Sequence, residues 1–292
     1  MIVEQIVQRQ AKLLSILRRE FALSSGLVKR LKWQDAFFIN GVRAHTDQPV
    51  MPGDCVRVVL YEQVEGFEPE PLPLSILYED EAFLAVDKPA GLLVHPSPQR
   101  NSGTLANAVL HHLLAAGEQS GVHPVTRLDR DTFGVVLFAK NANVHDRFCR
   151  MLRQGELEKT YLATVFGQPP QDEGEIDLPV YKIGGGNLIR VVDARGQKAL
   201  THYRILQRGA QTALLQLHPL TGRTHQLRLH CLASGFPILG DPQYTTEAAS
   251  AYSCAQGLFT QQLCAAQLVF AHPMHGGQMR IVSRQTVRFP ED

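Results

Sequence analysis

The stretch PVTRLDRDTFGVVLFAKN, residues 124–141, joins a dense group of charges to an apolar run. The second half, GVVLFAK, has the length and composition of a buried strand. The charged half, TRLDRDT, must then lie in the turn that enters this strand, and functional side chains are common on loops that a rigid strand holds. An ordinary surface loop with exposed Arg–Asp pairs is the alternative interpretation of this segment alone.

Length and composition indicate a globular protein with more than one unit. The chain has 292 residues, of which 44% are hydrophobic and 20% charged. This length exceeds the usual size of one compact domain, so we expect one large unit and a small accessory module. The composition excludes the disordered and fibrous classes.

The cysteines and the N-terminal residues predict a cytoplasmic protein. The five cysteines are scattered, without the close pairs of zinc sites or secreted disulfide scaffolds. The N-terminal MIVEQIVQRQAKLL carries polar residues where a signal peptide needs an apolar stretch. No later segment is apolar over the length that spans a bilayer, so we expect no membrane association.

Positive charge is concentrated at the front of the chain. The net charge is only +1, but residues 1–60 contain nine Lys or Arg against five Asp or Glu, which leaves 20 against 23 for the rest. A local excess of +4 is compatible with a nucleic-acid partner, although an excess of this size is more often a solvated surface.

Residues 1–60 have the pattern of a small α/β module. Apolar residues recur at helical spacing in two groups within residues 11–33, and Ser24 and Ser25 are able to cap the second helix. Asn40-Gly41 then suits the positive φ angles of a tight hairpin turn.

A linker and a large α+β unit are expected to follow. Residues 61–73, YEQVEGFEPEPLP, are acidic and proline-rich without a regular period, and we interpret them as a linker. In residues 74–292, short strands alternate with turns and a few helices, one of them expected within GTLANAVLHHLLAAG, residues 103–117.

A second chemistry-bearing stretch is LLQLHPLTGRTHQLRLHCLASG, residues 214–235. A strand is expected to end near Thr221-Gly222, and a helix to run from there to Gly235. His225 and Arg228 are three residues apart and share a helix face, where a helix start favours an anion. A solvated basic face of an amphipathic helix is the alternative.

The third stretch is ELEKTYLATVFG, residues 156–167, in which YLATVFG is strand-like. Its Tyr161 follows Lys159 closely. A lone tyrosine in a strand is usually a packing residue, and this stretch alone does not indicate more.

Together these segments resemble one family. RLDRDT with GVVLFAK, KTY with LATVFG, and GRTHQLRLH with GFPILGDPQY resemble, in that order, the signature segments of the RluA-type RNA pseudouridine synthases. YEDEAFLAVDKPAGLLVHPS and AHPMHGGQMRIVS extend the resemblance over nearly all of residues 74–284. The first 60 residues, with the looser pattern LSSGLVKRLKWQDAFFINGVRA, resemble the S4-type RNA-binding domain.

The resemblance implies an α+β fold and an isomerase. The expected architecture is a mixed, mostly antiparallel central sheet with flanking helices and an active-site cleft, plus the S4-like module. Asp129 matches the family's nucleophile, which detaches uracil from its N1 link and rejoins it through C5. The family uses neither an organic cofactor nor a metal, so we expect none here.

The resemblance also assigns neighbours to Asp129. A carboxylate that stays ionised beneath a base needs a fixed cation, because burial alone raises its pKa. Arg228 is that partner by the family pattern, and an arginine fork is able to grip a carboxylate and keep its charge. Tyr161 and Leu227 are expected to contact the target base. Arg127 is expected to fill the gap that the flipped uridine leaves in the RNA, or to grip the RNA backbone.

RNA is the expected partner, ribosomal or transfer RNA, bound by a monomer. A uridine in folded RNA must be flipped out before it can react, at a cost of a few kcal/mol. We expect the following residues to bind RNA outside the reactive pocket: Lys29, Arg30, Lys32 and Arg223.

Two departures from the family pattern leave an alternative open. Thr126 stands where histidine is usual, and Phe133 where a small serine is usual. Phe133 could crowd the loop, which favours a catalytically weakened RNA-binding paralogue that acts in RNA folding or ribosome assembly.

Other chemistries are weaker interpretations. Asp129 with Asp131 suggests a metal-free hydrolase, although adjacent turn carboxylates need not face one another. IGGGN, residues 183–187, lacks the Lys and Ser/Thr of a phosphate-binding loop. The histidines do not converge with Asp or Cys ligands, so we expect no metal site at His111, His112, His272 or His275.

Overall fold

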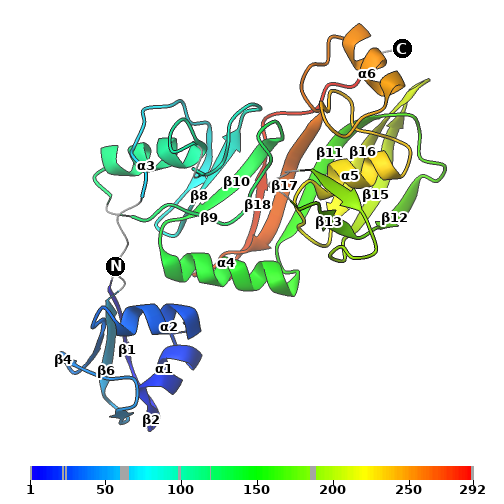
Figure 1. Ribbon diagram of the computed structural model, residues 1–292. Helices are drawn as coiled ribbons and strands as arrows, with labels where there is room; N and C mark the ends of the chain where they lie inside the picture. Colours follow the sequence, from blue (N-terminus) through cyan, green and yellow to red (C-terminus); the bar gives the residue numbers. More distant parts are fainter. Residues whose placement is uncertain are drawn as a thin grey trace.

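Two sheets organise the chain in the computed structural model (Figure 1). The structure describes residues 2–21, 23, 25–59, 66–97, 100–118, 120–184 and 189–290. We refer to residues 2–59 as the N-terminal unit and to residues 66–290 as the large unit.

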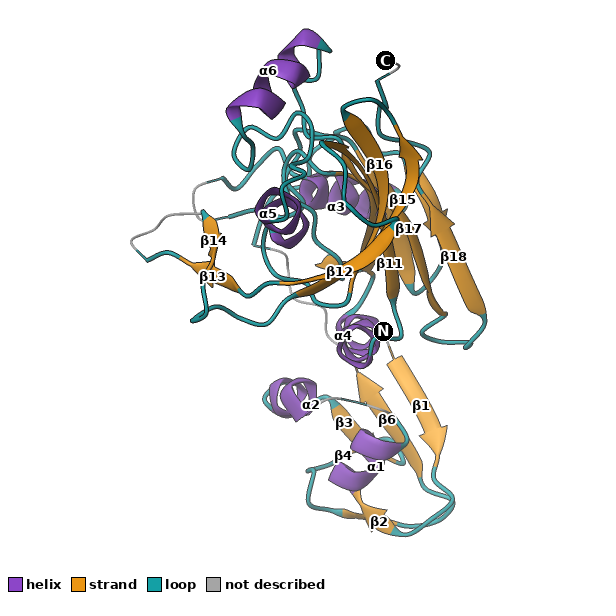
Figure 2. Cartoon of the chain, turned by 90° about the vertical axis from the view of Figure 1, so that its right-hand side faces the viewer, coloured by secondary structure: helices purple, strands orange, loops and turns teal. Residues whose placement is uncertain are grey.

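The N-terminal unit is a four-stranded antiparallel sheet with two helices on one side (Figure 2). The strand order is β1-β6-β3-β4, and a small β2–β5 pair lies outside this sheet. The elements are β1 (Ile2–Ile6), β2 (Ala11–Lys12), α1 (Leu13–Arg19), α2 (Ser25–Lys32), β3 (Phe37–Ile39), β4 (Val42–Arg43), β5 (Pro49–Val50) and β6 (Cys55–Val59).

The predicted helices and hairpin of this unit are confirmed. The β3–β4 turn places Asn40 at φ 50° and Gly41 at φ 80°, the left-handed region that the dipeptide was expected to adopt. Ser24, one of the two expected caps of α2, lies outside the described residues.

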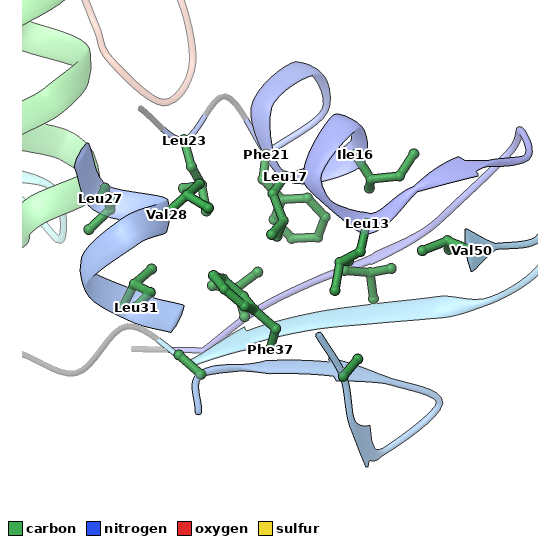
Figure 3. Close-up of a cluster of buried hydrophobic side chains, with 14 of the residues drawn as sticks. Leu13, Ile16, Leu17, Phe21, Leu23, Leu27, Val28, Leu31, Phe37 and Val50 are labelled. Atoms are coloured by element: carbon green, nitrogen blue, oxygen red, sulfur yellow. The ribbon is translucent and has the colours of Figure 1, made fainter. Parts of the chain in front are cut away.

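The core of the N-terminal unit lies between α1, α2 and the sheet (Figure 3). Leu27, Val28 and Leu31 of α2 point into this core, together with Leu17 of α1 and Phe37 of β3. The remaining positions of α2 are therefore left for solvent or a partner.

The large unit is built on a ten-stranded, mixed sheet, as predicted. Its order is β12-β15-β16-β11-β17-β10-β8-β7, with β18 beside β17 and β9 beside β10. All pairings are antiparallel except that of β10 with β17. The strands are β7 (Ile76–Glu79), β8 (Phe83–Lys88), β9 (His123–Pro124), β10 (Phe133–Ala139), β11 (Glu158–Phe166), β12 (Glu173–Asp177), β15 (Leu200–Arg208), β16 (Thr212–Pro219), β17 (Leu263–Ala271) and β18 (Gln278–Val282).

Four helices and one hairpin complete the large unit. The hairpin is β13 (Val180–Lys182) with β14 (Arg190–Val192), and the residues between 184 and 189, which include most of IGGGN, lie outside the described part of the chain. The helices are α3 (Leu105–Ala115), α4 (Ala142–Gln154), α5 (Gln226–Ala233) and α6 (Glu247–Ala255).

Strand β10 is buried along its whole length because helices cover both of its faces. Val135 and Leu137 belong to the apolar cluster of α4, whereas Val136 and Phe138 belong to the cluster of α3. Side chains alternate between the faces of a strand, so a continuous apolar run is required here. This explains the unbroken GVVLFA of the sequence.

The parallel contact of β10 with β17 depends on Gly134. This residue has φ 108°, and a Cβ atom there would lie 2.8 Å from the backbone nitrogen of Ala265. A side chain cannot be accommodated without moving one strand. The start of β10, and with it the preceding loop, is therefore held tightly against β17.

Half of the expected linker packs against the large unit. Phe67 is buried in the cluster of α3, and the Glu70 carboxylate accepts hydrogen bonds from the Gly103 N–H at 2.9 and 3.1 Å. The expected linker is therefore held against the large unit at Phe67 and Glu70, through one aromatic side chain and one carboxylate. Residues 60–65 lie outside the described residues.

Candidate active site

Three segments that are distant in sequence meet at one cavity. The loop between β9 and β10 carries Asp129, β11 carries Tyr161, and α5 carries Arg228. Ala265 of β17 pairs with Gly134 of β10 on one side and with Tyr161 of β11 on the other, so β17 sets their separation. The cavity has a volume of about 430 Å³ and is lined from all three segments.

Arg228 joins two carboxylates. Its Nη1 donates to Asp129 Oδ2 at 3.0 Å, while Nε and Nη2 donate to the two oxygens of Asp241 at 2.6 and 2.8 Å. Arg228 is 6% exposed and Asp241 is 4% exposed. Asp241 therefore fixes the guanidinium so that one N–H remains directed at Asp129.

Electrostatics keep Arg228 charged in this buried position. Burial would lower the pKa of the guanidinium, but the hydrogen bonds and charges of Asp241 and Asp129 together raise it. Asp241 is itself held by the backbone N–H groups of Gln243 and Tyr244, each 2.9 Å from Oδ1. The Asp129 carboxylate thus lies beside a cation that is itself fixed in place.

His225 forms a second contact to Asp129. Its Nε2 lies 3.8 Å from Asp129 Oδ2, and its Nδ1 lies 2.9 Å from the Tyr244 hydroxyl. That hydroxyl accepts the Arg190 N–H at 2.8 Å, so its own hydrogen is free for donation to Nδ1. Burial lowers the pKa of His225, which favours a neutral ring with its hydrogen on Nε2, toward Asp129.

The backbone at His225 is strained. This residue has φ 58° directly before α5, in a region that costs a non-glycine residue about 1–3 kcal/mol. Such strain is concentrated at functional sites, where the surrounding structure enforces it. With this backbone conformation, the His225 imidazole lies between the Tyr244 hydroxyl and Asp129.

Lys88 fixes the loop that carries Asp129 through hydrogen bonds to backbone carbonyls. The fully buried Lys88 donates to the carbonyls of Pro89, Leu92 and Arg130, at 2.9, 2.7 and 2.8 Å. Burial lowers the pKa of Lys88 to about 8, against the opposing charges of Asp131 and Asp129. This lysine connects the loop after β8 with the residue that follows Asp129.

Both departures from the family pattern have structural roles, and Thr126 also lines the cavity. The Thr126 hydroxyl accepts the Leu137 N–H at 3.0 Å, which joins the start of the loop to β10. Phe133 is buried in an apolar cluster with Cys264 and Val287 and does not line the cavity among its described residues. The Phe133 side chain thus packs in this cluster and not in the cavity lining.

The two carboxylates of the loop have different partners. Asp131 pairs with Arg130 at 3.0 and 2.9 Å, whereas Asp129 pairs with Arg228. Only Asp129 lines the cavity. This arrangement provides no second carboxylate for a hydrolytic pair within the described lining.

Tyr161 and Leu227 both line the cavity, as expected of residues that contact a base. Tyr161 is half-buried, and burial together with the charge of Asp129 raises the pKa of its hydroxyl. Leu227 is buried and also packs in the core beneath α5. The hydroxyl of Tyr161 is thus neutral at ordinary pH.

Two arginines stand at the rim of the cavity. Arg127 and Arg223 are exposed and line the cavity, and Arg127 has no hydrogen-bond or ion-pair partner among the described residues. Lys159 also lines the cavity, and burial lowers its pKa. These cations leave the opening positively charged.

The other expected RNA-binding residues are on α2. Lys29 and Lys32 are exposed, and the Arg30 side chain lies outside the described part of the molecule. Beside them is Trp33, 84% exposed, which the sequence analysis did not single out. This part of the N-terminal unit therefore combines positive charge with a free aromatic ring.

Two of the four histidines considered for a metal site pair with carboxylates. His112 Nε2 lies 2.8 Å from Glu79, and His272 Nε2 lies 2.7 Å from Asp80. Over the described residues, no group of three or more His, Cys, Asp or Glu side chains is placed to hold a metal ion. None of the helices in that part of the chain combines the length and apolarity needed to cross a bilayer.

Comparison with known proteins identifies the class. The sequence profile of the family described as RNA pseudouridylate synthase matches residues 82–233. The fold is similar to that of a solved human structure, RNA Pseudouridylate Synthase Domain Containing 1. Its TM-score is 0.58 and its identity 25%, and the match covers 75% of this chain and 86% of that one.

Two bacterial relatives extend the match. The ribosomal large subunit pseudouridine synthase D of Nitrosomonas europaea is 36% identical over 84% of this chain and 72% of its own. An uncharacterized RNA pseudouridine synthase of Aquifex aeolicus is 35% identical over 88% of this chain and 84% of its own. The chain belongs to the RluA-type family of RNA pseudouridine synthases, as the resemblance predicted.

Several residues of the site were not assigned a role from the sequence. They are Asp241, Tyr244, Lys88 and Lys159. Asp241 and Tyr244 lie in GDPQY, which was part of the resemblance, and Lys159 precedes Tyr161 in KTY. Only the fold shows that Asp241 and Arg228 form a pair, since nothing in the spacing indicates it.

Proposed function

We propose that Asp129 is the nucleophile with which this chain converts specific uridines of RNA into pseudouridine. The observation that carries this proposal is the Asp129–Arg228–Asp241 arrangement at the cavity. Asp129 Oδ2 accepts from Arg228, whereas Oδ1 has no hydrogen-bond donor among the described residues and remains available to the substrate.

The reaction is balanced without a further reactant. The C1′–N1 bond of the uridine breaks, uracil turns within the cavity, and a C1′–C5 bond forms. The hydrogen of C5 leaves and N1 gains one, so the composition of the RNA is unchanged. Asp129 acts at the reacting nucleoside, and Arg228 stabilises its negative charge.

The cavity walls have separate roles in this proposal. Tyr161 and Leu227 hold the flat base while it turns, and burial together with the charge of Asp129 keeps the Tyr161 hydroxyl neutral by raising its pKa. Arg127, free and exposed at the rim, takes the place of the flipped nucleotide or grips its phosphate. Arg223 contacts the backbone nearby.

We propose an S4-like role for residues 1–60, joined through residues 61–73 to a catalytic domain over residues 74–292. The exposed Lys29 and Lys32, with Arg30 from the same helix, would bind RNA phosphates. The exposed Trp33 would stack on an unpaired base. This support is independent of the cavity.

The proposed setting is a monomer in the cytoplasm that acts on ribosomal or transfer RNA. Ribosomal RNA of the large subunit is the first target to test, because the Nitrosomonas relative is named for that activity. The five cysteines are all unpaired, in keeping with a reducing compartment.

The test is a map of pseudouridines in cellular RNA. A strain without the gene should lack one or a few specific pseudouridines, and the wild-type gene should restore them. A gene with Asp129→Asn should not restore them. Restoration by Asp129→Asn would refute the nucleophile, and identical maps with and without the gene would refute the proposed substrates.

A further inference from the structure

A second hollow, the cationic cleft, lies beside the β13–β14 hairpin. It has a volume of about 350 Å³. Four basic side chains line it, and its described lining contains no carboxylate: Lys182, Arg190, Arg195 and Arg223. Such a concentration of one charge is unfavourable unless an anion completes it.

The cations of the cleft are only partly neutralised by the protein. Arg195 donates to both oxygens of Asp193, at 2.9 and 2.6 Å, and its guanidinium lies 4.6 Å from the centre of the Tyr181 ring. Arg223 Nε donates to the Lys198 carbonyl at 3.1 Å, which orients the arginine without neutralising it. Lys182 has no partner among the described residues.

The cationic cleft adjoins the catalytic cavity. Arg223 and Thr224 line both hollows, so an RNA strand that leaves one hollow can enter the other past the Arg223 cation. RNA carries one negative charge on every nucleotide. The phosphates next to a flipped uridine must therefore leave the cavity along its rim.

The cleft is also connected to the reactive carboxylate. Arg190 at the start of β14 donates its backbone N–H to the Tyr244 hydroxyl, which contacts His225, which in turn lies 3.8 Å from Asp129. The position of the hairpin and the position of the His225 ring are thus fixed by one shared hydroxyl.

We propose that the cationic cleft is a phosphate-binding site for the RNA strand that flanks the target uridine. This proposal rests on the proposed function and deepens it, because it names the part of the substrate that the hairpin recognises. Lys182 and Arg195 supply charge to phosphates one or two nucleotides from the reacting one. Arg223 bridges the two hollows.

The test replaces Lys182 and Arg195, neither of which lines the catalytic cavity. In the full-length protein, Lys182→Gln/Arg195→Gln should weaken binding of a 12-nucleotide oligouridylate about tenfold at low salt. It should also reduce the slope of log Kd against log salt by about 1.4, which corresponds to two lost contacts with a single strand. The turnover number on saturating RNA from the gene-deletion strain should remain that of the wild type.

Two matched variants serve as controls. Lys182→Arg keeps the charge and should keep the affinity. Arg280→Gln removes an exposed cation on β18 and should leave the salt slope unchanged.

A second measurement locates the contact within the RNA. Single methylphosphonates remove the charge of one phosphate at a time beside the target uridine. At one or two positions they should weaken wild-type binding but not binding by Lys182→Gln/Arg195→Gln. An unchanged salt slope in the double variant, or equal methylphosphonate effects on both proteins at every position, would overturn the proposal. Failure of the wild type to form pseudouridine would instead refute the proposed function.

Discussion

The catalytic cavity and the α2 face of the N-terminal unit are both positively charged, but their cations are held differently. In the cavity, Arg228 is buried and makes three hydrogen bonds to two carboxylates. On α2, Lys29 and Lys32 are exposed to solvent. The first arrangement fixes one atom beside another, whereas the second attracts phosphates without fixing them.

The cavity and the α2 face should therefore respond differently to salt concentration and to substitution. Dissolved ions screen buried pairs only weakly. The interaction between exposed charges is largely screened beyond one Debye length, roughly 8–10 Å. Changes in the cavity should therefore affect chemistry and stability, and changes on α2 should affect affinity and its salt dependence.

The largest effect is expected for Asp129→Asn. It should lower turnover by on the order of 10⁴-fold or more, because the proposed nucleophile is lost, while RNA affinity stays within about threefold. Single-turnover assays and filter binding measure the two quantities. Asp131→Asn, which alters the neighbouring carboxylate paired with Arg130, should keep most of the turnover. Equal losses in both variants would contradict the assignment.

Asp241→Asn should affect stability and chemistry together. It leaves the buried Arg228 without its main partner, which should lower the free energy of unfolding by about 3 kcal/mol. Turnover should fall as well, because the guanidinium is no longer held toward Asp129. Urea denaturation measures the first effect.

The matched control for Asp241→Asn is Asp172→Asn, which breaks the exposed pair with Arg208. A surface pair of this kind contributes about 0–1 kcal/mol. If Asp241→Asn and Asp172→Asn lowered the free energy of unfolding equally, burial would not explain the contribution of the Arg228–Asp241 pair.

The burial of Lys88 should make the free energy of unfolding depend on pH. The pKa of Lys88 is about 8 in the folded protein, against about 10.4 when unfolded, so the unfolded chain binds more protons between these values. The free energy of unfolding should therefore rise from pH 8 to pH 10.5 by about 3 kcal/mol relative to Lys88→Met. A difference between wild type and Lys88→Met that does not change with pH would contradict the burial argument.

The double substitution Lys29→Gln/Lys32→Gln should leave chemistry intact. We expect the slope of log Kd against log salt to fall by about 1.5, because two phosphate contacts are lost, with an unchanged turnover number. Lys12→Gln, an exposed lysine of the same unit, is the control. An equal effect of Lys12→Gln would mean that the charge of the whole unit matters rather than the α2 face.

Trp33 allows the smallest effect to be observed directly. It is the only tryptophan of the chain and is 84% exposed. RNA binding should quench its fluorescence, and Trp33→Ala should weaken binding about fivefold, the lower end of the range for one stacked base. Trp33→Phe should retain most of the affinity. Unchanged emission in an RNA-saturated sample would exclude stacking.

Much of the fold could be predicted from local pattern. The buried strand β10, the two helices of the N-terminal unit and the Asn40-Gly41 turn follow from periodicity and backbone preference, which depend on neighbouring residues only. The proline-rich composition of residues 61–73 did not predict that Phe67 packs in the apolar cluster of α3, because that contact joins distant parts of the chain.

The sequence by itself determined the family, the strand that carries the reactive loop, and the identity of Asp129, Tyr161 and Arg228, because these are matters of residue type and short spacing. Tertiary structure alone decided that Asp241 holds Arg228, that Phe133 packs in a cluster outside the cavity lining, and that the cationic cleft adjoins the cavity. Those relations join residues on different strands and helices, and the distances between such residues are set by sheet order and packing, which short spacing does not encode.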